Sequence, residues 1–215
     1  MSDIFTLDAA IQTKWLLDAG LKACRGYVFN LEYSTGLPAM ATTPVDVLVV
    51  GMNPGEAPER AEGYSKTSER RWLERCQFFA DAAGGRWATT ELVFWSSKNL
   101  NVLKERVRDL SPYLEWCADI NKALVAFHKP KLIFQPGLGW ASYAVQHYGL
   151  RHNRRYCRED GGKTLIEHYE MSDGTPWLCT PHWTAAFGFS RRDRELIRDE
   201  AARIIGRGGL TSDRG

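Results

Sequence analysis

Apolar and polar segments alternate along the chain in an order that predicts strands separated by helices. The residues from Val45 to Val50 form a short apolar run rich in β-branched side chains, which is typical of a strand buried on both faces. Two further short apolar runs, Glu91–Trp95 and Lys131–Gln135, predict strands of the same kind. Apolar residues near helical spacing predict helices over Glu69–Ala83 and Tyr113–Phe127. This alternation is typical of a parallel sheet between two layers of helices.

Both ends of the chain add elements to this pattern. We expect an amphipathic helix over Leu7–Cys24 and a further helix from Pro136 to Tyr148. Ser190 is expected to cap a last helix that ends near Ile205. Three short strands separated by glycine-containing turns predict a small antiparallel meander before that helix: Arg154–Arg158, Lys163–Glu170 and Thr175–Thr180.

Together these elements predict a single α/β domain over residues 1–206, arranged as a three-layer α/β/α sandwich. Its centre is a mainly parallel four-stranded sheet, to which the small antiparallel meander is added. Gly206, Gly208 and Gly209 are expected to end the last helix and to release residues 207–215 as a disordered tail.

The composition is that of an ordinary soluble globular protein. Of the 215 residues, 44% are hydrophobic and 25% are charged, and no apolar run is long enough to span a membrane. We expect no signal peptide. The five cysteines are scattered and form no C-x-x-C pair, so neither a disulfide framework nor a zinc site is predicted. The expectation is a reduced, cytoplasmic monomer that needs no metal or cofactor.

The first predicted strand ends abruptly in Gly51-Met52-Asn53-Pro54-Gly55. Two glycines and a proline beside an amide side chain predict a tight turn with several free backbone N–H groups. Ligands of open parallel sheets bind at the carboxyl ends of the strands, so this turn is a candidate site. On the pattern alone, the segment is equally well interpreted as a turn without further function.

The same turn after an apolar strand resembles the first motif of the uracil-DNA glycosylase superfamily. The likeness is closest to the branches that carry Asn in this motif, the single-strand-selective and the mismatch-specific uracil or thymine glycosylases. The superfamily's closing motif, usually His-Pro-Ser, is similar to His182-Trp183-Thr184, which keeps the His and a hydroxyl residue but has Trp183 in place of Pro. The resemblance covers nearly the whole domain, because the elements follow one another in the superfamily's order.

The resemblance implies a DNA glycosylase, which hydrolyses the N-glycosidic bond of a base flipped out of DNA. In that reaction Asn53 would hold the attacking water, and a neutral His182 would donate a hydrogen bond to a pyrimidine carbonyl oxygen. The backbone N–H of Met52 would bind a base carbonyl, and Tyr64 would supply the aromatic surface on which the base stacks. By residue type alone, His182 is more often a structural histidine, and Tyr64 is as well interpreted as a surface tyrosine.

The position that reads the base departs from the superfamily pattern. Uracil-removing relatives carry an Asn early in the second strand, where it pairs with uracil, and Glu91 aligns with it in this chain. An ionised carboxylate only accepts hydrogen bonds, so it cannot donate one to a uracil carbonyl. Three explanations stay open: Glu91 is protonated, the alignment is shifted, or the base is not uracil. Ser96 and Asn99, just beyond the strand, could supply the donor instead.

Two groups of residues near the end of the chain are candidates for DNA contact. Phe187, or else Phe189, would fill the gap left by the flipped base, unless these phenylalanines pack in the core. Ser190, Arg191 and Arg192 would bind a phosphate at the start of the last helix, unless they form only a capped, solvated helix start. Another basic cluster is the next candidate for this contact: Arg151, Arg154, Arg155 and Arg158.

The predicted function is that of a monofunctional glycosylase of DNA base-excision repair, which removes uracil first and hypoxanthine or mismatched thymine next. Its partner would be DNA with a damaged or mismatched base, which would bring it to the nucleoid. No lysine stands in the two motif loops to form a Schiff base, so strand cleavage is not expected. The alternative is a nucleic-acid-binding protein with the same fold and no catalysis, which Glu91 and the altered closing motif favour. A doubly wound nucleotide-binding domain fits less well, because no phosphate-binding glycine loop or G-K-[ST] follows the strand.

Overall fold

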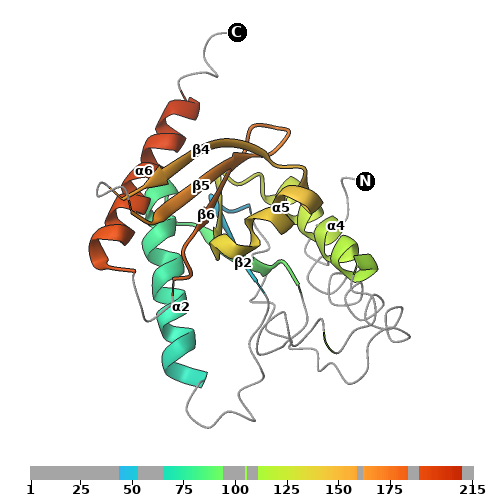
Figure 1. The fold of residues 1–215 in the computed structure, drawn as a ribbon, viewed down its shortest axis with the longest axis horizontal. Helices are drawn as coiled ribbons and strands as arrows, with labels where there is room; N and C mark the ends of the chain where they lie inside the picture. The colour runs from blue at the N-terminus through green and yellow to red at the C-terminus, as the bar shows by residue number, and fades with distance from the viewer. Residues whose placement is uncertain are drawn as a thin grey trace.

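A computed structural model describes residues 44–52, 65–93, 105, 111–158, 162–183 and 189–209 of the chain. In this part the fold is α/β, with a six-stranded mixed sheet and four α-helices (Figure 1). The helix expected over Leu7–Cys24 lies outside the described residues.

Six strands form the sheet: β1 (Val47–Gly51), β2 (Trp87–Glu91), β3 (Leu132–Pro136), β4 (Arg151–Cys157), β5 (Thr164–Glu170) and β6 (Pro176–Thr180). They lie in the order β2-β1-β3-β6-β5-β4. The first four in this order are parallel to one another, whereas β5 and β4 run antiparallel to their neighbours. The sheet therefore has a parallel half and an antiparallel half, joined at β6.

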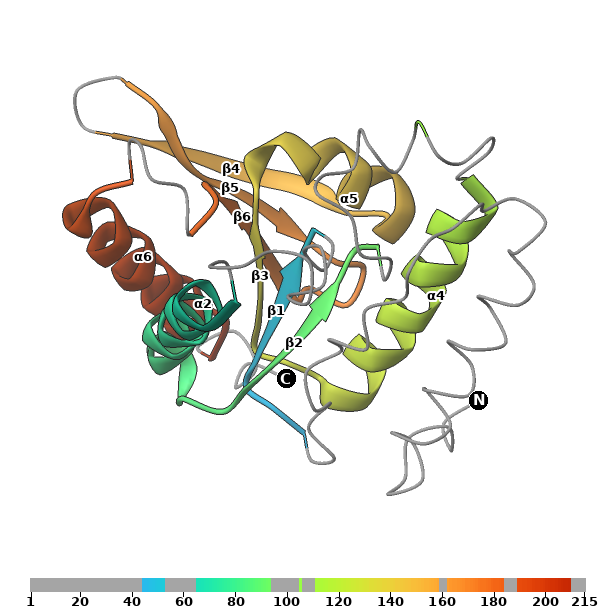
Figure 2. The same cartoon turned by 90° about the horizontal axis from the view of Figure 1, so that it is seen from below.

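Four α-helices and two 3₁₀-helices complete the described part: α2 (Ser65–Ala80), η2 (Asp81–Ala83), α4 (Ser111–His128), η3 (Leu138–Trp140), α5 (Ala141–Tyr148) and α6 (Arg191–Gly209). The helices α2 and α6 cover one face of the sheet, and α4 and α5 cover the other (Figure 2). Helix layers on both faces are what the strand–helix alternation predicts. None of the described helices is long and apolar enough to cross a membrane.

The central strand β1 explains why its sequence is an uninterrupted apolar run. All of its residues are buried. Val47 and Val49 pack with Phe79 on the side of α2 and α6, while Leu48 and Val50 pack on the side of α4 and α5. Successive side chains of a strand point to opposite faces, so a strand covered on both faces needs apolar residues throughout. The prediction of a doubly buried strand is confirmed.

The four parallel strands and the antiparallel meander that the sequence predicts are both present, but they form one continuous sheet and not a four-stranded sheet with a separate addition. β6 pairs in parallel with β3 through Ile133 and Trp177, and antiparallel with β5 through Glu167 and Cys179. A sheet that ended at β6 would present a row of unpaired backbone groups, and β5 covers that edge. The result is one sheet of six strands.

The second strand occupies Trp87–Glu91, and the prediction of Glu91–Trp95 is wrong. Gly84 and Gly85 both have positive φ and turn the chain directly after η2. As a result, the backbone oxygen of Arg86 already accepts hydrogen bonds from the start of β1. Glu91 is therefore the last residue of this strand, not an early one.

The last helix extends to Gly209, past the predicted end near Ile205. Residues 207–209 therefore belong to α6, which corrects the prediction of a disordered tail from 207 onwards. An interior glycine costs a helix only about 1 kcal/mol relative to Ala, so these glycines do not by themselves end it. Residues 210–215 lie outside the described part of the chain.

Candidate functional site

The carboxyl ends of the four parallel strands meet at one edge of the sheet, which carries several of the predicted site residues. Glu91 ends β2 and pairs in register with Gly51, which ends β1. Pro136 ends β3 and pairs with Thr180, the last residue of β6 before the turn that contains His182. Open parallel sheets bind their ligands at this edge, so both halves of the predicted site lie where a ligand is expected.

The side chain of Glu91 lies directly over Gly51. A Cβ atom at position 51 would come within 2.1 Å of Glu91 Oε2 and within 2.8 Å of Glu91 Oε1. The backbone N–H of Leu92 donates to the oxygen of Gly51 at 2.8 Å, which continues the pairing past the strand end. A side chain at position 51 would therefore displace the carboxyl group, which occupies the space of a Cβ atom there.

Burial raises the pKa of Glu91 to about 8, because the ionised carboxylate would lose its hydration there. Its Oε2 atom is buried and has no hydrogen-bond partner among the described residues. Cys76 of α2 lies within electrostatic reach: burial, and secondarily the negative charge of Glu91, raise the pKa of its thiol. At neutral pH the carboxyl and the thiol are therefore both uncharged.

A buried hydrogen-bond network fixes the end of β2 from the opposite face of the sheet. Asn121 of α4 donates from Nδ2 to the backbone oxygen of Glu91 at 2.8 Å and to the hydroxyl of Tyr148 at 2.8 Å. Its Oδ1 accepts a hydrogen bond from Thr90 Oγ1 at 2.7 Å. Buried polar groups have to be paired, so this network determines where the backbone of Glu91 lies.

Met52 follows β1 and packs across the sheet edge onto the turn after β3. Gly137 in that turn has a φ of +125°, and a Cβ atom there would lie 3.1 Å from Met52 Sδ. The backbone oxygen of Met52 accepts a hydrogen bond from the N–H of Val93 at 3.0 Å. The side chain of Met52 thus forms part of the strand-end surface, while the role of its N–H in binding a base stays a prediction.

His182 lies half-buried on the turn after β6, on the side of α2. Its ring stacks on that of Trp72, with centroids 6.2 Å apart and 27° between the ring planes. Burial lowers the pKa of His182 below the usual 6.5, because the imidazolium would lose its hydration. At pH 7 the ring is therefore neutral, with one N–H donor and one acceptor nitrogen.

Trp183, which stands where the superfamily motif has Pro, anchors this turn in the core. It is 3% exposed and stacks on Phe79 with 4.4 Å between the ring centroids. Its indole N–H donates to Thr180 Oγ1 at 2.9 Å. An anchored neighbour restrains the backbone of His182, which is the structural effect that a proline would also have.

The start of α6 has the predicted cap. Ser190 Oγ accepts a hydrogen bond from the N–H of Asp193 at 3.1 Å, and the Asp193 carboxylate accepts one from the N–H of Ser190 at 2.7 Å. Arg158 pairs with the same buried carboxylate. A negative charge of the protein therefore already lies at the positive end of this helix, where a phosphate was predicted.

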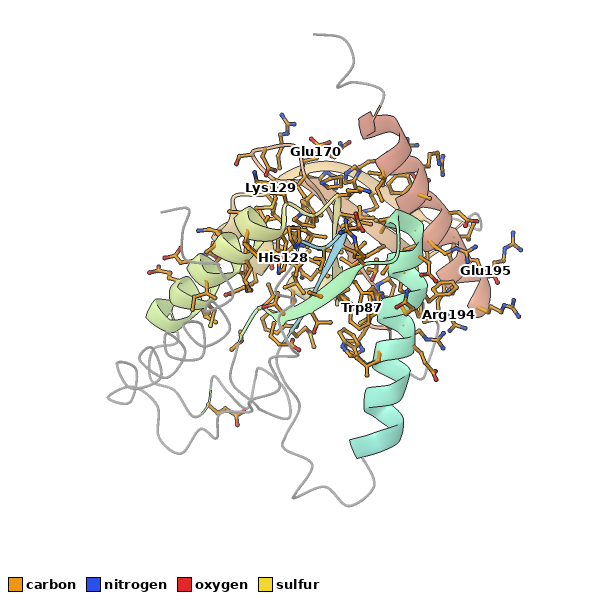
Figure 3. The ribbon with its side chains drawn as sticks, turned by 180° about the vertical axis from the view of Figure 1, so that it is seen from behind. Trp87, His128, Lys129, Glu170, Arg194 and Glu195 are labelled. Carbon is orange, nitrogen blue, oxygen red and sulfur yellow. The ribbon has the colours of Figure 1, made fainter. Side chains whose placement is uncertain are left out.

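The arginines at the start of α6 point outwards. Arg191 is 86% exposed and pairs with Glu195 one helical turn later, at 2.8 Å. Arg192 is exposed as well. Figure 3 shows Arg194 and Glu195 on this helix, on the side of the molecule away from α4. These positions are accessible to a phosphate backbone, and the contact itself stays a prediction.

The other basic cluster is largely neutralised by carboxylates. Arg151 of β4 pairs with Glu170 at 2.8 Å, and Arg155 pairs with Glu167 at 2.5 Å. Arg154 lies over a tyrosine ring of the same strand, 5.0 Å from its centroid. This cluster therefore offers a phosphate less net positive charge than its sequence indicates.

Several predicted site residues lie outside the described part of the chain: Asn53, Tyr64, Ser96, Asn99 and Phe187. Phe189 is described, and it packs against the core under α2 and α6, which favours the core interpretation of this residue. Within the described ranges, no group of three His, Cys, Asp or Glu side chains is arranged to hold a metal ion.

Three residues belong to the site although the sequence pattern indicates only helix cores. The pattern predicts Trp72 and Cys76 as inward-facing residues of a helix, without a link to His182 or Glu91. Asn121 does carry a signal, since it is an amide on the apolar face of its helix and is 1% exposed. A polar residue at such a position indicates a buried network, but not its partners.

The sheet edge thus combines a neutral carboxyl group, a neutral imidazole ring and the glycine that ends β1. Such groups can hold, orient and polarise a ligand through hydrogen bonds, without a metal or a net charge. No protein-family model matches the chain, and neither does any curated protein.

Proposed function

We propose that the chain is a monofunctional DNA glycosylase with the fold of the uracil-DNA glycosylase superfamily. It hydrolyses the bond between deoxyribose and a deaminated base that has left the helix stack, uracil first and hypoxanthine or mismatched thymine next. The observation that carries the proposal is the neutral His182 beyond the carboxyl end of β6, on the same sheet edge as the Gly51-Met52 end of β1.

The departing base explains why a neutral imidazole is suited to this position. Cleavage of the N-glycosidic bond leaves negative charge on the base, and part of it develops on a carbonyl oxygen. An imidazole N–H that is already in place stabilises this charge without giving up its proton. Burial keeps His182 in the neutral form, and the ring of Trp72 restrains its plane. The hydrogen bond gains most in the transition state, where the charge is largest.

The attacking water is assigned to Asn53, which follows β1 by two positions. The sugar develops oxocarbenium character, so a water held below its anomeric carbon can add to it. The amide oxygen of Asn53 accepts a hydrogen bond from this water and orients it, because an amide is a negligible base. The products are the free base and an abasic site, and the strand stays intact.

Base release from labelled oligonucleotides tests the proposal. The oligonucleotides carry uracil, hypoxanthine, xanthine or a G·T mismatch, and alkali afterwards cleaves any abasic site. Asn53→Ala and His182→Ala should each lower kcat by about a hundredfold or more, with DNA binding nearly unchanged. His147→Ala, on the far end of α5, is the matched control. Release that neither Asn53→Ala nor His182→Ala reduces contradicts the assignment.

A nucleic-acid-binding protein without catalysis is the second candidate, and the carboxyl of Glu91 at the base-reading position favours it. The two candidates differ in one measurement. A protein that binds oligonucleotides in fluorescence anisotropy but releases no base from any of the four substrates supports binding alone.

A further inference from the structure

We infer that Arg75 of α2 and Arg194 of α6 together bind one phosphate group of the DNA backbone, next to the nucleotide whose base is removed. The ligand is a phosphodiester, and it is held between the side faces of two helices, apart from the arginines expected to contact DNA at the start of α6. The inference rests on the proposed function, because that function makes DNA the source of the phosphate.

The packing of α2 beside α6 brings the two arginines together. Both helices lie on the same face of the sheet and run in the same direction (Figures 1 and 2). The guanidinium of Arg198 on α6 lies over the ring of Phe78 on α2, 5.0 Å from its centroid. Arg75 and Arg194 each stand about one helical turn before these residues, so they occupy the same level of the two helices.

The side chain of Arg194 is held in position before any ligand arrives. It is half-buried, its Nη1 donates to the backbone oxygen of Phe189 at 3.4 Å, and its guanidinium lies 6.0 Å from the centroid of the same phenylalanine ring. Burial, and secondarily the positive charges of Arg75 and Arg191, lower the pKa of Arg194. Guanidinium groups stay protonated in proteins, so two like charges are kept within electrostatic reach of each other.

The carboxylates around this pair of charges are engaged elsewhere. Asp193 and Glu195 are the acidic residues that act on Arg194, and both already form ion pairs with other arginines. Within the described part of the chain, no ion pair joins Arg75 or Arg194 to a carboxylate. An anion between the two guanidinium groups would relieve their repulsion. A phosphate suits this position, because its oxygen atoms accept hydrogen bonds from both planar donors at once.

The location of the pair identifies the phosphate as one of the DNA strand. Trp72 stacks on His182, the residue assigned to the departing base, and it precedes Arg75 on α2 by three residues. Three residues of a helix correspond to a rise of about 4.5 Å, which is within the span of one nucleotide. Contacts to phosphates fix the register of a strand without reading its sequence. The two arginines therefore hold the strand where its base leaves the stack.

Single neutral linkages test the contact. The probe is a labelled oligonucleotide whose uracil nucleotide carries a 2′-fluorine, so that it resists hydrolysis and reports binding alone. A methylphosphonate replaces one phosphate at a time around the uracil. The wild type should lose about tenfold in affinity at one of these linkages. Arg75→Ala and Arg194→Ala should each bind the unmodified oligonucleotide about tenfold more weakly and lose nothing further at that linkage.

The salt dependence shows whether both arginines share one phosphate. If they do, the double variant should reduce the slope of affinity against salt by about one ion, because one phosphate is neutralised. Lys122→Ala removes an exposed charge from α4, on the other side of the sheet, and is the control. It should stay within about twofold of the wild-type affinity. Where an alanine variant does not fold, Arg75→Gln or Arg194→Gln removes the charge and keeps most of the side chain.

Three results overturn the inference. The first is an affinity of Arg75→Ala and Arg194→Ala equal to that of the wild type. The second is a slope reduced by about two ions together with two separate sensitive linkages, which would mean independent contacts. The third is a flat methylphosphonate series in which inorganic phosphate, at constant ionic strength, raises the urea midpoint of the wild type and not that of Arg75→Gln. This last result would assign the pair to a free phosphate and not to DNA.

Binding and base release together distinguish a failure of the inference from a failure of the proposed function. If the wild type releases no base but both arginine variants abolish the sensitivity to one neutral linkage, the inference stands and catalysis fails. If the wild type releases uracil and neither variant changes affinity or the methylphosphonate series, the proposed function stands and the inference fails. Neither base release nor binding to the oligonucleotide contradicts both.

Discussion

Gly51 and Glu91 are paired across the ends of two parallel strands so closely that a Cβ atom at position 51 would lie 2.1 Å from Glu91 Oε2. Gly51 has no positive φ, so its backbone alone does not require glycine. Glycine instead leaves room for the carboxyl group, which a larger residue would displace. The glycine of the turn motif and the acidic residue of the next strand are therefore one structural unit.

Gly51→Ala should lower the free energy of unfolding by about 1 to 3 kcal/mol, because the added methyl group displaces the carboxyl of Glu91. In a Glu91→Ala background the same substitution should cost little, since the space is empty. Urea unfolding of the wild type, both single variants and the double variant measures this coupling. Additive effects of the two substitutions would show that the side chains do not compete for space.

Glu91→Gln should become more stable than the wild type as the pH rises. In the unfolded chain Glu91 loses its proton near the usual 4.5, but in the folded protein only near 8. Between these values the folded state binds more protons, so the stability of the wild type falls with increasing pH and Glu91→Gln escapes this loss. The advantage should grow by on the order of a few kcal/mol between about pH 4 and about pH 9. Urea unfolding at both pH values, with Glu115→Gln as control, measures it; an advantage that is constant with pH contradicts the raised pKa.

The rate of base release should fall as the pH is lowered, and this acid limb of the pH profile should lie below pH 6.5, because burial lowers the pKa of His182 from that value. The unfolded chain binds this proton at a higher pH than the folded protein does. The neutral ring therefore contributes stability that is complete above 6.5 and is lost as the pH falls through the lowered pKa. A pH profile of kcat/KM for uracil release checks the position of the limb, and His182→Gln should abolish it. If the rate instead falls at or above pH 6.5, the pKa of His182 is not lowered, which would mean that the ring is not buried during the reaction.

The fold could be predicted where the signals are local. The apolar run of β1 and the cap at Ser190 are each encoded within a few neighbouring residues, and both are confirmed. The second strand is different, because it contains Thr89 and Thr90, both of them buried polar residues. Thr90 is accommodated there by Asn121, which is distant in sequence, so the apolar residues after Glu91 gave the stronger strand signal. The pairing of β6 with β3 is likewise a long-range contact without a local signal.

The candidate site could be predicted at the level of strand ends and not at the level of contacts. Met52 and His182 lie at the carboxyl edge of the sheet because strand direction follows from the strand–helix alternation. The close approach of the Glu91 carboxyl to Gly51 joins β2 to β1, and the stacking of Trp72 on His182 joins α2 to the turn after β6. Sequence spacing carries no information on such contacts, because packing of α2 on the sheet creates them.

The two arginine clusters, which are alike in sequence, differ in how firmly their charges are held. Glu167 is buried, so its pair with Arg155 on β4 is partly shielded from water. The pair of Arg191 with Glu195 is an exposed contact one helical turn apart, and such pairs are worth only about 0.3 to 0.5 kcal/mol. Exchanging the carboxylate partner for a phosphate should therefore cost Arg191 less than it costs Arg155.

Replacing Arg191 and Arg192 together with Ala should weaken binding to all DNA sequences alike and reduce the salt dependence by up to about two ions. The carboxylate at the start of α6 limits the contribution of the helix end itself, so the arginine side chains should carry most of the effect. Arg151→Ala combined with Arg155→Ala is the matched control, because it removes the same charge from arginines whose carboxylate partners are less exposed than Glu195. Fluorescence anisotropy with an undamaged duplex over a series of salt concentrations measures both slopes. A larger change in the control pair would place the DNA-binding surface on β4 instead of α6.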